Sequence, residues 1–314
     1  GAVAARKELP ADVELVLIGD ANLIREELAA CGAKESDFTI VHTTSVIEMA
    51  EHPVKAFKEK PDSSISIGYK MLATKQLDGF ASAGNTGAMM VGAMYAVKTV
   101  PGLIRPSLIS LLPKENGNTN VILDVGVNAD CKPDVLYQFG VLGSIYAKLI
   151  LKYDNPRVAL LNIGEEAEKG NLNTQAAYGL MKDTKDFNFV GNIEGRDVFD
   201  DKCDVIVCDG FTGNIVIKEG EGIYHLMKKR GIVDEYFERF NYEIYGGSPI
   251  LGINSTAVVG HGISNETAIK NMILLTKDVA AANLSNIIKE AFMNNHISMQ
   301  YTNDFATCFF KSSI

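Results

Sequence analysis

The sequence predicts an α/β protein built on a mostly parallel, Rossmann-like doubly wound sheet. Short runs of apolar and β-branched residues alternate along the chain with segments of helical periodicity. The runs are almost continuously apolar, as expected for strands that are buried on both faces of a parallel sheet. Each run ends in Gly, Asn, Asp or Thr before the next helical segment, which is typical of the loops at the carboxyl edge of such a sheet.

The expected elements follow one another without a repeat, a low-complexity tract or a linker. Strands are expected at 13–20, 38–44, 79–84, 120–128, 157–164, 187–193 and 203–210, and helices at 21–32, ending at Gly32, and at 64–79, ending at Gly79. We therefore expect a single domain over residues 1–296. It includes a helical excursion at 215–245 and is followed by a tail at 297–314 with no assigned role.

Composition and charge exclude several classes of protein. A net charge of -9 argues against nucleic acid as the main partner. The five cysteines are odd in number and irregularly spaced, and no His/Cys spacing matches a metal site, which indicates reduced, buried thiols in a cytoplasmic protein. No apolar run approaches the roughly 20 residues that a membrane span needs. The segment "GAVAARKELP" has no secretory signal and opens as if within a helix, so natural residues are expected to precede it.

The loops after four of the strands are rich in small polar residues. The clearest is "FASAGNTGAMMVGAM", residues 80–94, which places five of them together without a charge. Glycines let backbone N–H groups approach a ligand, and a helix N-terminus adds about half a positive charge. Any one such loop is as readily ordinary loop sequence, but four of them indicate an anion site, although neither a Walker A nor a GxGxxG motif is present. The candidate phosphate ligands in the first loop are Ser82, Gly84, Asn85, Thr86 and Gly87.

Six segments, in this order, resemble the PlsX phosphate acyltransferases. They are "SAGNTGA" (82–88), "LDVGVNADCKP" (123–133), "LLNIGEEAEKGN" (160–171), "VGNIEGRD" (190–197), "CDGFTGN" (208–214) and "YGGSPILGINSTAVVGHG" (245–262). The resemblance covers about residues 1–290. It implies a fold like that of isocitrate and isopropylmalate dehydrogenases and phosphotransacetylases, and a homodimer. The family's first strand, with its Asp-Ala-Met-Gly-Gly-Asp-like loop, has no counterpart here.

The resemblance also implies a reaction. A long-chain acyl group passes from acyl carrier protein to inorganic phosphate, and a glycerol-3-phosphate acyltransferase then uses the acyl phosphate for phospholipid synthesis. A thiolate leaves readily because its pKa is about 8.5, so positioning and electrostatics suffice, and no cofactor, metal or covalent nucleophile is expected. Lys169 and Asn214 are the catalytic candidates. Taken without the resemblance, Lys169 is a solvated lysine and Asn214 a helix cap.

The remaining candidates are expected to bind phosphate or the acyl donor. Arg105 and Arg196 are expected either to bind phosphate or to form structural salt bridges. Asp209 is expected to orient its loop, and His261 is either a phosphate donor or a structural hydrogen-bonding group. The further binding candidates are Asn128, Asp209, Gly210, Thr212, Gly213 and His261.

An acidic chain needs a basic patch to dock an acidic carrier protein, and the available clusters lie at 228–230 and 55–60. Val233, Tyr236, Phe237 and Phe240 recur at helical spacing, which indicates a core or dimer contact more than a membrane anchor. Their position beside a basic cluster still allows weak peripheral membrane binding.

Three alternative functions compete with this interpretation. The first is a phosphotransacetylase-like enzyme that uses acyl-coenzyme A. The second is a nicotinamide-dependent decarboxylating dehydrogenase, which would need a metal-binding aspartate cluster and substrate arginines that the sequence does not offer. The third is a non-catalytic scaffold for lipid-synthesis enzymes.

Overall fold

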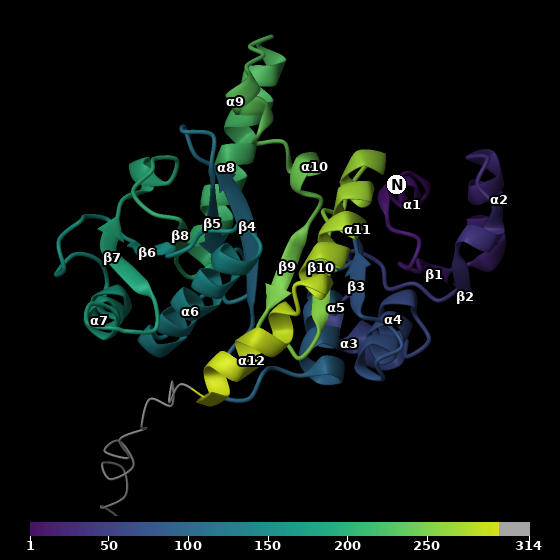
Figure 1. The fold of residues 1–314 in the computed structure, drawn as a ribbon, viewed down its shortest axis with the longest axis horizontal. Helices are drawn as coiled ribbons and strands as arrows, with labels where there is room; N and C mark the ends of the chain where they lie inside the picture. Colours follow the sequence, from purple (N-terminus) through teal and green to yellow (C-terminus); the bar gives the residue numbers. More distant parts are fainter. Residues whose placement is uncertain (295–314) are drawn as a thin grey trace, which may run out of the picture.

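In the computed structural model, which describes residues 1–294, a central sheet has the strand order β3-β10-β9-β4-β5-β8-β6-β7 (Figure 1). A separate parallel pair, β1 (Val16–Gly19) and β2 (Thr39–His42), lies beside it. The strands of the central sheet are β3 (Gly79–Ser82), β4 (Ser107–Pro113), β5 (Thr119–Leu123), β6 (Arg157–Leu161), β7 (Asn188–Ile193), β8 (Val205–Val207), β9 (Ser248–Leu251) and β10 (Thr256–Val259).

The direction of the strands changes in the middle of the sheet. The pairs β3/β10, β5/β8, β8/β6 and β6/β7 are parallel. The pairs β10/β9, β9/β4 and β4/β5 are antiparallel. Consequently β3 and β10 run opposite to β5, β8 and β6. Their carboxyl ends lie at opposite edges of the sheet, and this corrects the expectation that all four polar loops share one edge.

Helices cover both faces, as the doubly wound class predicts. One face carries α3 (Pro53–Glu59), α4 (Ser64–Ala73), α5 (Thr86–Gly92) and α8 (Gly210–Lys229), whose buried or partly buried apolar residues share one core. The other face carries α6 (Pro133–Leu149), α7 (Leu172–Met181), α11 (Glu266–Ala281) and α12 (Leu284–Asn294). The shorter α1 (Ala2–Glu8) packs against α11, and α2 (Ala21–Ala30) packs against β1 and β2.

Most expected elements are present, with shorter bounds. The helix expected at 64–79 ends at Ala73, and the strand expected at 120–128 ends at Leu123, where the chain turns into a loop. The expected strands lack β4, β9 and β10, of which β4 and β9 supply the antiparallel pairings. Asn116-Gly117, between β4 and β5, is a hairpin signal that predicts the β4/β5 pair.

The cysteines match the expectation of buried thiols only in part. Cys131, Cys203 and Cys208 are buried free thiols as expected, whereas Cys31 is exposed. Cys308 and the expected tail at 297–314 lie outside the described residues. Within residues 1–294, no helix combines the length and the apolarity that crossing a membrane requires.

The excursion at 215–245 is helical and projects from the body of the chain (Figure 1, top, green). After α8 come α9 (Glu235–Glu238) and α10 (Tyr242–Tyr245). Tyr236 and Phe240 pack edge to face at 5.5 Å between ring centroids, and Phe240 packs in the same way on Phe199 at 5.2 Å. These rings are thus intramolecular contacts, whereas Val233 is 79% exposed.

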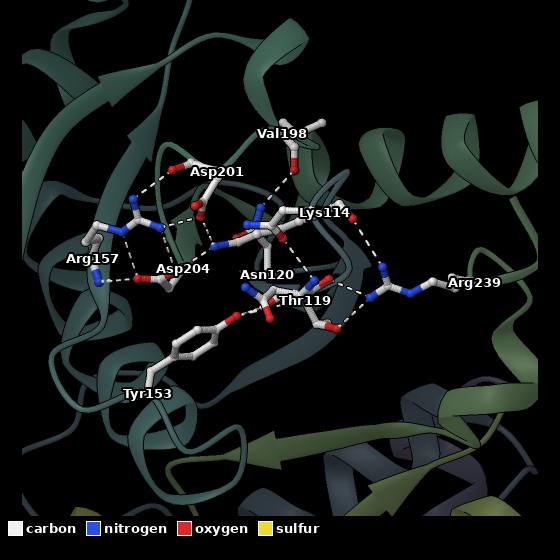
Figure 2. A network of polar contacts seen from close by, with 11 residues as sticks. Lys114, Thr119, Asn120, Tyr153, Arg157, Val198, Asp201, Asp204 and Arg239 are labelled. Carbon is white, nitrogen blue, oxygen red and sulfur yellow. Dashed lines mark hydrogen bonds and ion pairs between the residues drawn. The ribbon is translucent and has the colours of Figure 1, made fainter. Parts of the chain in front are cut away.

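An ionic network centred on two buried side chains, Lys114 and Asp204, fixes the base of this projection (Figure 2). Lys114, which is fully buried at the end of β4, pairs with Asp204 at 2.6 Å and Asp201 at 2.9 Å. Arg157 at the start of β6 pairs with the same two carboxylates. Arg239, just after α9, donates to the carbonyl oxygen of Lys114 at 3.1 Å. The network therefore joins β4, β6 and the loop before β8 to the projecting helices.

The network makes stability depend on acidic pH. Burial alone would raise the pKa of Asp204, but hydrogen bonds from Arg157 and Lys114 outweigh it and lower this pKa to about 2. A depressed folded-state pKa contributes stability that is complete above the unfolded value of 3.8 and is lost as pH falls through about 2.

We therefore expect the free energy of unfolding to decrease by about 2 kcal/mol between pH 4 and pH 2 through this carboxylate. Urea denaturation of wild type and Asp204→Asn across that range measures the difference. As pH falls, the free energy of unfolding of wild type should decrease more steeply than that of Asp204→Asn. The same pH dependence in both proteins would show that Asp204 does not titrate as its contacts require.

Candidate active site

Three of the four polar loops converge on one cavity. They follow β5, β6 and β8, whose carboxyl ends share an edge of the sheet. The cavity has a volume of about 320 Å³. Its polar lining comes from the first turns of α7 and α8 and from the ends of these strands, namely Asp130, Asn162, Asn171, Asn173, Thr174, Asp209 and Thr212. Two helix N-termini therefore border the same space, which favours an anion or a carbonyl oxygen.

A buried carboxylate shapes the loop after β5. Asp124 is fully buried and accepts backbone N–H bonds from Leu108 and Val125, both at 2.9 Å, and from Val127 at 3.1 Å. Burial raises its pKa, and hydrogen bonds from Asn128 and Leu108 oppose that shift. Because its oxygens are occupied by these donors, Asp124 organises the loop and is not aimed at a ligand.

The side chain of Asn128 holds the same loop in place through hydrogen bonds. Its amide donates to the carbonyl oxygen of Pro106 at 2.8 Å and to Asp124 at 3.1 Å. Its backbone carbonyl accepts from the N–H of Gly210 at 2.7 Å, which connects this loop to the start of α8. Both N–H groups of the Asn128 amide are therefore already bonded, and neither is free to bind phosphate as predicted.

The loop after β8 begins α8. The carboxylate of Asp209 accepts from the N–H of Thr212 at 2.7 Å and caps the helix, as the expected orienting role requires. A Cβ on Gly213 would lie 2.0 Å from the carbonyl oxygen of Asp124. Only glycine lets the helix and the β5 loop approach so closely.

Lys169 lies in the loop after β6, beside the cavity. The carbonyl oxygen of Lys169 accepts from the amide of Asn162 at 3.0 Å, and Asn162, Gly170 and Asn171 all line the cavity. Gly170 has a φ of +92° and faces Asn162 so closely that a side chain would collide with it. The loop backbone is thus fixed, while the side chain of Lys169 is exposed.

The loop after β3 lies at the other edge, next to the end of β10. Asn85 is buried and caps α5 by accepting from the N–H of Ala88 at 2.9 Å. Its amide also donates to the carbonyl oxygens of Glu48, Met49 and Glu51 at 3.0–3.2 Å. The predicted phosphate ligand therefore has its side chain committed to structure.

Ser82 and Thr86, two further candidates of this loop, lie close to Asn85 in the chain. The hydroxyl of Ser82 accepts from the N–H of Gly84 at 3.1 Å, and Thr86, at the first position of α5, is exposed. The N–H of Gly260 donates to the carbonyl oxygen of Ser82 at 2.9 Å, which brings His261 to the same edge.

α8 spans the distance between the two groups of loops. Asn214, in its second turn, lies against Gly126 of the β5 loop and does not cap the helix, because Asp209 does. Four residues later, Lys218 lies 3.4 Å from His261. Four residues of helix rise about 6 Å, so the α8 face that carries Asn214 connects the Lys169 side of the site to the His261 side.

Neither the two arginine candidates nor the buried cysteines add to this site. Arg196 pairs with Glu194, and Arg105 donates to the carbonyl oxygen of Asp130 at 3.3 Å. Burial raises the pKa of Cys131 to about 12 and that of Cys208 well above its ordinary value, with Asp124 and Asp209 adding to both shifts. Both thiols stay protonated at neutral pH and are poor nucleophiles.

Comparisons with known proteins place the chain in a family. A family model described as "Fatty acid synthesis protein" matches residues 1–287. A phosphate acyltransferase from Halothermothrix orenii is 40% identical over 310 residues, which covers 92% of either chain. Another, from Dictyoglomus turgidum, is 39% identical over 92% of this chain and 91% of its own. The chain belongs to the phosphate acyltransferase family.

Solved structures confirm the fold. A phosphotransacetylase from Streptococcus pyogenes superposes with a TM-score of 0.62 at 20% identity, over 90% of both chains. The EutD phosphotransacetylase from Staphylococcus aureus gives 0.61 at 17% identity, over 89% of this chain and 90% of its own. The relatives confirm the family resemblance, and these structures confirm the fold class that the sequence predicts.

Proposed function

We propose that this chain transfers a long-chain acyl group from acyl carrier protein to inorganic phosphate, giving an acyl phosphate for phospholipid synthesis. Membership of the phosphate acyltransferase family supports the reaction. The observation that carries the proposal is the convergence of the β5, β6 and β8 loops on one cavity, with Lys169 in a fixed loop beside it. A phosphate oxygen attacks the thioester carbon, a C–O bond forms, and the C–S bond then breaks to release the thiolate.

Lys169 and Asn214 supply the charge and the donor that this reaction needs. The ammonium of Lys169 compensates the negative charge of phosphate and of the tetrahedral intermediate. The amide of Asn214 donates to the oxyanion without changing its own charge. Asp209 and Gly210 hold the start of α8 against the β5 loop, and thereby position Asn214. The backbone of Gly84 to Gly87 and the hydroxyl of Thr86 are proposed to complete phosphate binding.

The proposed partners meet the chain away from this cavity. At the end of α8 a basic cluster, 228–230, lies beside Leu226, Ile232 and Val233, which are 57%, 44% and 79% exposed. This combination supports weak peripheral contact with an anionic membrane. The same basic cluster supports docking of the acidic carrier protein. We also propose a homodimer.

The activity is tested with palmitoyl-acyl carrier protein and inorganic phosphate, without added metal or nicotinamide. We expect acyl phosphate to form in proportion to enzyme, and acyl-coenzyme A to be the poorer donor. Preference for acyl-coenzyme A would instead favour the phosphotransacetylase-like alternative, to which the shared fold points. Vesicle binding without turnover on either donor would favour the scaffold.

A further inference from the structure

A lysine and a histidine lie next to each other where α8 passes the end of β10. The Nζ atom of Lys218 lies 3.4 Å from Nε2 of His261. On the other side of the ring, the N–H of Ile263 points at Nδ1 at 3.4 Å. Burial, together with the charge of Lys218, lowers the pKa of His261, so the ring is neutral at neutral pH.

A neutral imidazole cannot satisfy both neighbours, because it has one acceptor nitrogen and one N–H. If Nδ1 accepts from Ile263, then Nε2 carries the proton and faces an ammonium. If Nε2 accepts from Lys218, the proton on Nδ1 faces the N–H of Ile263. Either tautomer leaves two donors pointing at each other without an acceptor. An anionic oxygen between Nζ and Nε2 would accept from both and fix the Nε2–H tautomer.

We propose that Lys218 and His261 together bind the phosphate dianion that attacks the acyl donor. This inference rests on the proposed function and assigns its phosphate to one place. Three observations support that place. Lys218 lies one helical turn from Asn214, on the connecting face of α8. Its side chain is 49% exposed, so a soluble anion can reach it. The end of β3 lies beside the end of β10, which brings the Gly84–Thr86 backbone to the same edge.

Glu221 sets the strength of this site. Its carboxylate pairs with Lys218 at 2.7 Å, one turn further along α8. It occupies part of the ammonium's hydrogen-bonding capacity, and its charge opposes a second anion. Phosphate must therefore compete with Glu221 for Lys218. This competition predicts opposite effects of the two substitutions on phosphate affinity.

The test separates the KM for phosphate from the KM for the acyl donor. For Lys218→Gln we expect the KM for phosphate to rise about ten- to a hundredfold, the loss typical of a hydrogen bond to a charged group, with the KM for acyl-acyl carrier protein unchanged. Lys218→Arg should recover part of the loss, and Glu221→Gln should lower the KM for phosphate below the wild-type value. Lys182→Gln, which removes an exposed lysine just after α7 and outside the basic cluster at 228–230, is the matched control.

A binding measurement keeps this inference separate from the activity. Inorganic phosphate added to the ¹⁵N-labelled protein should shift the His261 ring resonances toward the Nε2–H tautomer, with His261→Gln providing the assignment. The shift should be absent in Lys218→Gln. A rise only in the KM for the acyl donor, or a His261 signal that saturating phosphate leaves unmoved, would overturn the proposal. If wild type makes no acyl phosphate, the proposed function fails, and the titration alone decides the anion site.

Discussion

Lys169→Ala is expected to lower kcat/KM for acyl transfer to phosphate by about a hundred- to a thousandfold, the effect typical of removing one donor to a developing oxyanion. The physical reason is the geometry of its loop. Asn162 and the tight turn at Gly170 hold the backbone beside the cavity, while the side chain extends from it. The substitution thus removes the charge without disturbing a packed core. Initial rates of acyl phosphate formation measure the loss.

The controls distinguish chemistry from structure. Lys182→Ala removes an exposed lysine at the other end of α7 and should leave the rate unchanged. Asn214→Ala should reduce the rate by a similar factor to Lys169→Ala, because it removes a donor to the same oxyanion. The double variant should then fall less than the product of the two losses, since groups that act as a unit are not additive. A Lys169→Ala enzyme within threefold of wild type would remove this lysine from the mechanism.

The fold could be predicted from the sequence because strands that are buried in a parallel sheet have continuous runs of apolar residues. β1, β2, β3, β6, β7 and β8 all lie within their expected segments. The antiparallel strand β9, only four residues long, was missed. Its pairings with β10 and β4, together with the antiparallel β4/β5 pair, make β3 and β10 run opposite to β5. The β9 segment begins with Ser248 and Pro249, which give a weak local strand signal. The reversal separates loops that a purely parallel sheet would have joined.

The site could be predicted only in part, for a related reason. Residue type and family resemblance make Lys169, Asn214 and His261 candidates, but they do not show whether a candidate's side chain already has hydrogen-bond partners within the protein. Asn85 and Asn128 looked like ligands, yet their amides bind carbonyl oxygens of residues far along the chain, 34 or more residues away for Asn85. Lys218 had a usable signal, because it follows Asn214 at i+4 and so shares its helical face. Its contact with His261 depends on the tertiary fold alone.

The largest effect on stability is expected from Lys114→Met, at the centre of the ionic network. Lys114 is fully buried and pairs with Asp204, which is also buried. Removing one partner of a buried pair leaves the other charge undercompensated and costs about 3–5 kcal/mol. Its Nζ also lies over the ring of Tyr153, 5.4 Å from the centroid. We therefore expect a decrease of this size in the free energy of unfolding, measured by urea denaturation.

Two matched variants show whether burial is the cause. Asp201→Asn removes a half-exposed carboxylate from the same network and should cost at most about 1 kcal/mol, because solvent screens such pairs. Lys148→Met removes an exposed lysine from α6 and should be near neutral. Because Arg239 binds the backbone of Lys114, early proteolysis in Lys114→Met should fall within 229–241. If Lys114→Met instead unfolds like Lys148→Met, with the projection intact, Arg157 alone compensates Asp204 and the lysine is dispensable.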